Sequence, residues 1–369
     1  MSAEIGGSRT GAGAVAKPRG PMTDTPVPTT QAQSRRATYP GFRATLKLVG
    51  TGPRGSRDLS FEEARGALGG LLRGEATSAQ AGAFLIATRI KGESPDELAG
   101  YAQALRDAAR PLRTQADRPL VACAGAYDGS VDAPHLSLAA AVVAAACGAG
   151  IALHCGSPLG PKHGVTARDV LAELGGPRSP TPSQSEAMLA RSGVTLIDTS
   201  RVLAGWNALR TLRNEIGLRG PVHSGEKLID YFGARRFVVG YTHSPYAPRL
   251  LGALELLGAE RAVAVRGTEG SDVVRPARPV AQDLSGPLEL PARPGTAGGQ
   301  GGAVASAQLT EAILTGLHRG PERDAVILSA ALRLYAAGLV DDARDGLDPA
   351  DRAICDGGAR ATLQAMING

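Results

Sequence analysis

Three glycine-containing loops hold the side chains whose types and spacing could do chemistry. The first runs from Ala124 to Ser130 and contains Gly125, Tyr127, Asp128 and Gly129. Glycines let a backbone approach a ligand closely, and free N–H groups at the start of the next helix favour phosphate. The carboxylate at position 128 can hold a magnesium ion or a sugar hydroxyl. The alternative is a plain turn built on Asp128–Gly129, and these residues taken alone favour it.

The second loop runs from His154 to Gly164 and brings one lysine and two histidines near the start of a helix. Lys162 is a natural phosphate ligand because its ammonium group acts as a point charge. His154 ends an apolar run, where a histidine is as often a core residue as a ligand. Lys162 and His163 lie beside a glycine at a helix start, so a binding role and a plain loop stay equally open.

The third loop, from Arg266 to Asp272, contains two carboxylates, Glu269 and Asp272. Carboxylate oxygens on a loop that follows an apolar run can bind a hard cation. Solvated turn residues are the alternative, and the sequence does not decide between the two.

Short apolar runs that alternate with helical segments must position these loops. Such alternation predicts a parallel sheet covered by helices on both faces, with ligands bound where the strands end at their carboxyl side. The expected strands are 119–123, 151–154, 194–197, 237–240 and 262–265, and the expected helices are 136–147, 166–174, 248–257, 325–337 and 358–367. Residues 283–302, rich in proline and glycine, are expected to form a loop or linker.

A helical unit precedes this region. It has three capping boxes, in which a hydroxyl and a later side chain satisfy the free backbone donors at a helix start. They are Ser60 with Glu63, Thr77 with Gln80, and Ser94 with Glu97. The predicted organisation is a disordered basic tail over 1–50, with its low-complexity part over 1–40. A helical domain over 55–118, completed by helices within 203–232, and an α/β domain over 119–369 follow.

Composition narrows the functional classes. The chain has 369 residues and a formal net charge of +5, and the whole excess lies in residues 1–50, which hold seven Lys or Arg against two Asp or Glu. The remainder is neutral, so no global field attracts a nucleic-acid backbone. The four cysteines lack the spacing of a zinc site, and there is neither a signal segment nor an apolar run of the roughly 18 residues that a membrane helix needs. We therefore expect a cytoplasmic protein that does not enter a membrane.

Several segments resemble anthranilate phosphoribosyltransferase, in order, over about residues 57–369. They include Arg89-Ile90-Lys91-Gly92-Glu93, Arg213-Asn214-Glu215-Ile216-Gly217, Val239-Gly240-Tyr241 and Asp324-Ala325-Val326-Ile327-Leu328. The resemblance implies a small helical domain beside a larger α/β domain, a cleft between them and a homodimer. It also implies transfer of phosphoribose from phosphoribosyl pyrophosphate to a small aromatic amine, with magnesium.

The resemblance also suggests roles for single residues. Arg213 is expected at the acceptor site, and Asp272 with Glu269 is expected to hold magnesium. No catalytic residue is assigned. The expected donor and phosphate site consists of Gly125, Tyr127, Asp128, Gly129, Ser137, His154, Lys162, His163 and Gly164.

The chain departs from the family's motifs at this site. Tyr127 replaces a glycine of the motif GTGGD, and its side chain is expected to obstruct close approach of the backbone to a ligand. The motif KHGNR becomes 153–157 without either basic residue, and the metal pair Asp-Glu becomes Asp272-Val273. Tyr127-Asp128-Gly129 resembles a divergent, anthranilate phosphoribosyltransferase-like branch instead. The expectation is an altered donor site with weakened magnesium binding.

A non-catalytic protein that binds single-stranded nucleic acid is the alternative function. A basic strip would support it, and residues 200–236 supply candidates. Few aromatic side chains for base stacking and the neutral folded part count against it, so the enzyme is the favoured hypothesis. The candidates are Arg201, Arg210, Arg213, Arg219, Lys227, Arg235 and Arg236.

Overall fold

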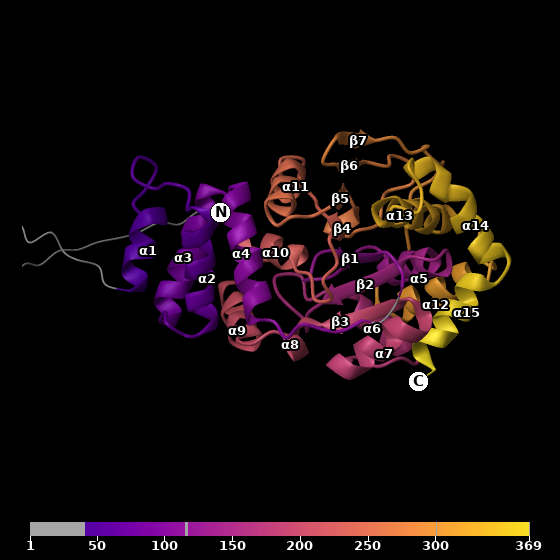
Figure 1. Ribbon diagram of the computed structural model, residues 1–369, viewed down its shortest axis with the longest axis horizontal. Helices are drawn as coiled ribbons and strands as arrows, with labels where there is room; N and C mark the ends of the chain where they lie inside the picture. The colour runs from indigo at the N-terminus through magenta and orange to yellow at the C-terminus, as the bar shows by residue number, and fades with distance from the viewer. Residues whose placement is uncertain (1–40, 115–116, 300, 369) are drawn as a thin grey trace, which may run out of the picture. The chain divides into compact units, whose positions relative to one another are not determined.

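The computed structural model describes residues 41–114, 117–299 and 301–368 (Figure 1). The low-complexity tail expected over residues 1–40 lies outside these ranges. No helix in the described part of the chain is long and apolar enough to cross a membrane.

Four helices begin the described chain, and the three predicted capping boxes are all present. Each cap hydroxyl accepts the backbone N–H three residues later, and the side chain there accepts the N–H of the cap. The fixed starts orient the apolar faces of α2 and α4, which pack on each other. The four helices are α1 (Phe42–Val49), α2 (Phe61–Leu72), α3 (Ser78–Lys91) and α4 (Pro95–Ala108).

Helix α1 corrects the predicted boundary of the tail, because residues 42–49 of the expected disordered stretch are helical. The Phe42 ring meets Phe84 edge-on with a centroid distance of 5.5 Å, and Val49 is buried. Phe42, Leu46 and Val49 share one face at helical spacing. The glycine- and proline-rich composition of the preceding segment hid this periodicity.

Three helical segments of the region 199–225 follow the third strand, and two of them pack on the first helices. Helix α9 contacts α2 and α3, and α10 contacts α3 and α4. The later chain therefore returns to the helical unit. The segments are α8 (Thr199–Val202), α9 (Trp206–Ile216) and α10 (Pro221–Gly225), followed by the short η1 (Glu226–Leu228).

A seven-stranded sheet confirms the predicted α/β class. Its order is β3-β2-β1-β4-β5-β6-β7, and the first five of these strands are parallel. Beside them, β6 and β7 pair antiparallel at one edge. The strands are β1 (Leu120–Ala124), β2 (Gly150–Cys155), β3 (Val194–Asp198), β4 (Arg236–Gly240), β5 (Arg261–Val265), β6 (Ala281–Asp283) and β7 (Gly286–Leu288).

The hairpin β6–β7 corrects the expected loop over residues 283–302. The Asp283 carboxylate accepts the N–H groups of Ser285 and Gly286 and so closes a tight turn. Pro287 lies on the last strand in the sheet order, where a missing N–H is tolerated. The polar, proline-containing sequence is typical of a loop, and only the pairing with β5 makes these residues strands.

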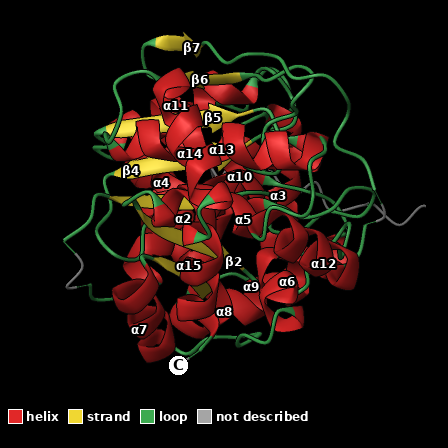
Figure 2. Cartoon of the chain, turned by 90° about the vertical axis from the view of Figure 1, so that its right-hand side faces the viewer, coloured by secondary structure: helices red, strands yellow, loops and turns green. Residues whose placement is uncertain are grey.

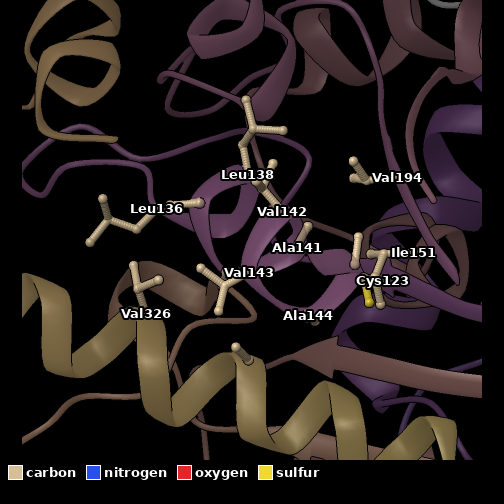
Figure 3. Packing of buried hydrophobic residues seen from close by; sticks show 14 of the residues in the cluster. Cys123, Leu136, Leu138, Ala141, Val142, Val143, Ala144, Ile151, Val194 and Val326 are labelled. Carbon is tan, nitrogen blue, oxygen red and sulfur yellow. The ribbon is translucent and has the colours of Figure 1, made fainter. Parts of the chain in front are cut away.

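Helices cover both faces of the sheet (Figure 2), and strand residues alternate between two cores. Val121 and Cys123 face one core, whereas Ala122 and Ala124 face the other. Figure 3 shows part of the first core, where α5 packs against α13 and the sheet. The covering helices are α5 (Ser137–Ala146), α6 (Ala167–Glu173), α7 (Pro182–Ser192), α11 (Tyr246–Leu256), α12 (Ala303–Leu314), α13 (Pro321–Ala337), α14 (Leu347–Cys355) and α15 (Gly358–Ile367).

Candidate functional site

A cleft of about 680 Å³ opens at the carboxyl ends of the central strands. The loops after β1, β2 and β4 form its α/β side, as expected for a parallel sheet. Residues of α3, the segment 217–227 and α11 form the remaining wall. Lining side chains that bear on chemistry are Arg89, Glu93, Asp128, Lys162, Arg219, His223, Lys227, Tyr241, His243 and Tyr246.

The first two predicted loops are fastened to each other. The Gly164 N–H donates to the Asp128 carbonyl at 2.8 Å, and Ser130 and Val165 exchange two backbone hydrogen bonds. Gly129 has a φ of 76°, and a Cβ there would lie 2.5 Å from the Gly164 carbonyl carbon. The glycines at 129 and 164 thus allow the close contact between the two loops. Gly125 packs similarly against the third loop, and a Cβ there would lie 3.1 Å from Ser271 Cα.

Asp128 is fully buried and forms a bidentate ion pair with Arg219. The two N–O distances are 2.8 and 2.9 Å, and Lys162 Nζ lies 4.0 Å from the same carboxylate. From sequence, Arg219 was expected only as part of a basic strip, and its pairing with Asp128 was not predicted. Glycines on both sides of the segment Leu218–Arg219 were the available signal of a loop that approaches the site.

Lys162 connects the cleft to the third loop. Its Nζ donates to Glu269 Oε2 at 3.1 Å and to the Glu269 carbonyl at 3.3 Å. The same carboxylate accepts backbone N–H groups of Val131, Asp132 and Ala133. Partial burial works to raise the pKa of Glu269, but the backbone donors and Lys162 outweigh it and hold the pKa below its usual value.

Asp272 lies in a closed environment instead. Both it and Arg333 of α13 are fully buried and form an ion pair, and the Ser137 hydroxyl donates to the other carboxylate oxygen. Among the described residues, no group of three His, Cys, Asp or Glu side chains could hold a metal ion. Asp272 is paired with Arg333 and Glu269 with Lys162, and two carboxylates with separate cationic partners do not fit the predicted magnesium ion.

Tyr127 and His154 belong to the interior. The Tyr127 hydroxyl and His154 Nδ1 share a hydrogen bond of 2.5 Å, and Thr199 Oγ1 lies 3.1 Å from that hydroxyl. Burial lowers the pKa of His154 to about 3, so its ring is neutral at physiological pH. The Tyr127 ring packs edge-on against Trp206, and Tyr127 also contributes to the lining of the cleft. His163 is exposed and is not part of the cleft lining.

Arg213, the expected acceptor-binding residue, already has a partner. Its guanidinium donates to both oxygens of Glu226 at 2.6 and 3.1 Å, and it lies 5.2 Å from the Trp206 ring centroid. Both members of the pair are buried, and neither lines the cleft. An incoming carboxylate would have to displace Glu226, so this arrangement does not favour the predicted role.

Two further basic side chains in the wall were not assigned to the site from sequence. Lys227 Nζ donates to the Gly240 carbonyl at 2.7 Å, and burial lowers the pKa of Lys227 to about 8. His223 Nδ1 accepts the Gly220 N–H, and its Nε2 donates to the Gly160 carbonyl at 3.2 Å. Burial lowers the pKa of His223 well below its usual value, so this ring is a neutral brace between loops.

The part of the cleft wall next to α3 and α11 has a different character. Glu93 follows α3, is 3% exposed and accepts the Tyr246 hydroxyl at 3.1 Å. Burial raises the pKa of Glu93. Arg89 donates to the Arg219 carbonyl and so links α3 to the cationic end. No role in the site was predicted for Arg89 or Glu93 from sequence.

The candidate basic strip over 200–236 is largely neutralised by neighbouring carboxylates. Arg213 pairs with Glu226 and Arg219 pairs with Asp128. Arg235 and Arg236 both pair with Glu260. Four of the seven candidate cations are therefore matched by a carboxylate, which weakens the case for a nucleic-acid surface.

Models of a glycosyl transferase family match the chain in two places. The helical bundle domain matches residues 45–109, and the α/β domain matches residues 128–360. The anthranilate phosphoribosyltransferase of Anaeromyxobacter dehalogenans strain 2CP-C is 34% identical over 322 residues, which cover 84% of this chain and 94% of that protein. Anthranilate phosphoribosyltransferase 2 of Streptomyces coelicolor is 33% identical over 320 residues, or 83% and 94% of the two chains.

Solved structures agree. The anthranilate phosphoribosyltransferase of Thermus thermophilus superposes with a TM-score of 0.74 at 28% identity, covering 84% of this chain and 94% of that one. The Saccharomyces cerevisiae enzyme in complex with PRPP and Mg has a TM-score of 0.73 at 19% identity, with coverages of 88% and 97%. At that lower identity the likeness is one of fold.

Proposed function

Because the chain belongs to the anthranilate phosphoribosyltransferase-like glycosyl transferase family, we propose that it transfers phosphoribose from phosphoribosyl pyrophosphate to an aromatic amine or related acceptor. The observation that carries the proposal is the cluster of Lys162, Arg219 and Lys227 around Asp128 in the cleft. Three cations face the two carboxylates of Asp128 and Glu269, which leaves a net positive charge where strand-end loops meet. Such a site attracts a diphosphate.

In this proposal the cationic end of the cleft binds the donor's phosphates. The bond between the ribose C1 and the diphosphate oxygen breaks, a bond from C1 to the acceptor nitrogen forms, and that nitrogen loses a proton. Lys162, Arg219 and Lys227 stabilise the negative charge that develops on the departing diphosphate, which is usually the largest contribution to catalysis. Asp128 orients Arg219 through their bidentate ion pair.

The acceptor is proposed to bind against the part of the cleft wall next to α3 and α11. Tyr241, Tyr246 and Leu250 offer aromatic and apolar surface, and Glu93 can accept a hydrogen bond from an amino group. Arg213 is not given this role, because its charge is already matched by Glu226. Enzymes of this kind gain rate by holding both reactants in one orientation.

Magnesium enters this proposal only by family likeness, since a relative of the same fold is described in complex with PRPP and Mg. Magnesium would neutralise diphosphate charge, but Asp272 and Glu269 do not fit as its ligands here. The proposal therefore assigns that neutralisation to the basic side chains of an altered donor site. A homodimer and a cytoplasmic location are also proposed by resemblance.

A calorimetric titration of phosphoribosyl pyrophosphate into the full chain tests the donor site. We expect binding in the micromolar range that becomes at least about tenfold weaker in Lys162→Ala, since the ammonium group meets the anion directly. The matched control is Arg360→Ala, which removes an exposed cation of α15 and leaves affinity unchanged. Absence of binding to the folded wild-type chain would remove the proposed function.

A further inference from the structure

Three successive backbone N–H groups converge on one carboxylate in the loop before α5. The Val131 N–H lies 3.1 Å from both oxygens of Glu269, and those of Asp132 and Ala133 lie 3.1 and 3.3 Å from Oε1. Consecutive amides that point into one concavity form an anion-binding nest. Glu269 reaches this nest from a loop more than a hundred residues away in the sequence.

Lys162 completes the nest and links it to the cleft. Its Nζ lies 3.1 Å from Glu269 Oε2 and 4.0 Å from Asp128 Oδ1. The lysine also lines the cleft. The nest is therefore continuous with the proposed donor site through a single ammonium group.

The occupant of the nest is held in an unfavourable backbone conformation. Glu269 has φ 55° and ψ 19°, in the left-handed region that side chains other than glycine rarely adopt. In the described chain, His163 is the other non-glycine residue with positive φ, and it follows Lys162 directly. Residues held in such conformations cluster at ligand sites and switch regions.

We propose that the amides of residues 131–133 together with Lys162 form a subsite for a phosphate-type oxyanion, and that Glu269 is a built-in occupant which the incoming anion displaces. This inference rests on the proposed function, in which the anion is a phosphate group of the donor. A phosphate presents more acceptor oxygens and more charge than a carboxylate, so it can replace Glu269 on the same donors. Displacement also relieves the left-handed backbone at position 269.

Two consequences separate this occupant from a carboxylate that merely braces a loop. An occupant competes with the anion, so its removal strengthens anion binding. A brace pre-forms the site, so its removal weakens binding. The pKa of Glu269 stands below its usual value, so the carboxylate is charged and competes at neutral pH.

The test is calorimetric titration of inorganic pyrophosphate into the full-length wild type, Glu269→Ala and Glu269→Gln. We expect the dissociation constant to fall at least about tenfold in Glu269→Ala and less in Glu269→Gln, whose amide oxygen still accepts the backbone N–H groups. Glu322→Gln is the matched control, because Glu322 also accepts a backbone N–H, from Gly298, and pairs with a basic side chain, His318. It leaves the affinity unchanged.

Amide NMR shifts locate the binding. On addition of pyrophosphate to Glu269→Ala, the signals of Val131, Asp132 and Ala133 move, and adding Lys162→Ala abolishes the movement. Unchanged or weaker pyrophosphate affinity in both folded Glu269 variants, or shifts that spare these amides, would overturn the proposal.

The outcomes also separate this inference from the proposed function. If the wild type binds phosphoribosyl pyrophosphate but neither Glu269 variant binds pyrophosphate more tightly, Glu269 is not a displaceable occupant, and the proposed donor site still stands. If pyrophosphate binds at the amides of residues 131–133 in Glu269→Ala but the protein transfers phosphoribose to no amine, the nest is supported and the proposed enzymatic function is contradicted.

Discussion

Two aspartates that the sequence assigned to the site each pair with an arginine, but the two ion pairs lie in different environments. Asp128 and Arg219 meet at the wall of the cleft, where the arginine side chain is 33% exposed. Asp272 and Arg333 are both fully buried beneath the strand ends. The same chemistry thus gives one pair that a ligand can reach and one that holds the fold. Exposure of the cation decides which of the two roles an ion pair can have.

The largest effect is expected from breaking the buried ion pair of Asp272 and Arg333. Arg333→Met leaves the Asp272 charge buried without a partner, which should lower the free energy of unfolding by about 3–5 kcal/mol. Urea denaturation followed by circular dichroism measures the change. Asp272→Asn with Arg333→Met should recover part of the loss, because no unpaired charge remains. A loss below about 1 kcal/mol in the single variant would mean that the pair does not hold the fold.

Breaking the ion pair of Asp128 and Arg219 at the cleft wall should change donor binding more than it changes stability. Arg219→Ala removes a cation from the cleft, and we expect affinity for phosphoribosyl pyrophosphate to fall at least about tenfold. The free energy of unfolding should fall by less than in Arg333→Met, because Lys162 lies 4.0 Å from the Asp128 carboxylate and solvent reaches the arginine's position. Arg219→Lys should restore only part of the affinity, since an ammonium group cannot form the bidentate contact. Equal affinity in the wild type and Arg219→Ala would contradict the comparison.

The pH dependence of donor binding tests the proposed role of Lys227. Burial lowers the pKa of Lys227 to about 8, so this side chain is charged below that pH and neutral above it. Affinity for pyrophosphate should therefore decline as the pH rises from about 7 to about 9, a range in which an ordinary lysine stays charged. Calorimetry over this range measures the decline, and Lys227→Met should flatten it. A wild-type affinity that is constant or increases with pH would contradict this role.

The smallest effect is expected from magnesium alone. Because Arg333 and Ser137 already occupy the Asp272 oxygens, millimolar magnesium without a donor should leave the melting temperature unchanged. Differential scanning fluorimetry with calcium as a second cation checks this. A stabilisation by magnesium that disappears in Asp272→Asn would show that the buried Asp272 carboxylate binds metal.

Local patterns predicted most of the fold. Capping boxes fixed the starts of α2, α3 and α4, and short apolar runs marked the five parallel strands. Several elements were not predicted, among them the helices α1, α7, α12 and α14 and the strands β6 and β7. Helix α1 borders a segment whose composition is typical of disorder, and β7 becomes a strand only through its neighbour in the sheet. Pairing between distant segments is decided by tertiary packing, which a local pattern does not contain.

The site was predicted less well, for the same reason. Lys162 and Asp128 do reach the cleft, because strand-end loops of a parallel sheet gather at one edge. The partners of Arg213 and Asp272 depend on packing between distant segments. One signal was present and unused: Arg333 lies within an apolar helical run, where an arginine needs a buried carboxylate.

The central claim is that the cationic end of the cleft binds the donor, and hydrogen–deuterium exchange with phosphoribosyl pyrophosphate tests it most directly. Bound donor should slow exchange in the segments 126–133, 158–164 and 217–227, which carry the three cations and the amide nest. Arg219→Ala should lose that protection at the same donor concentration. Protection confined to other parts of the chain, or none under saturating donor, would contradict the account.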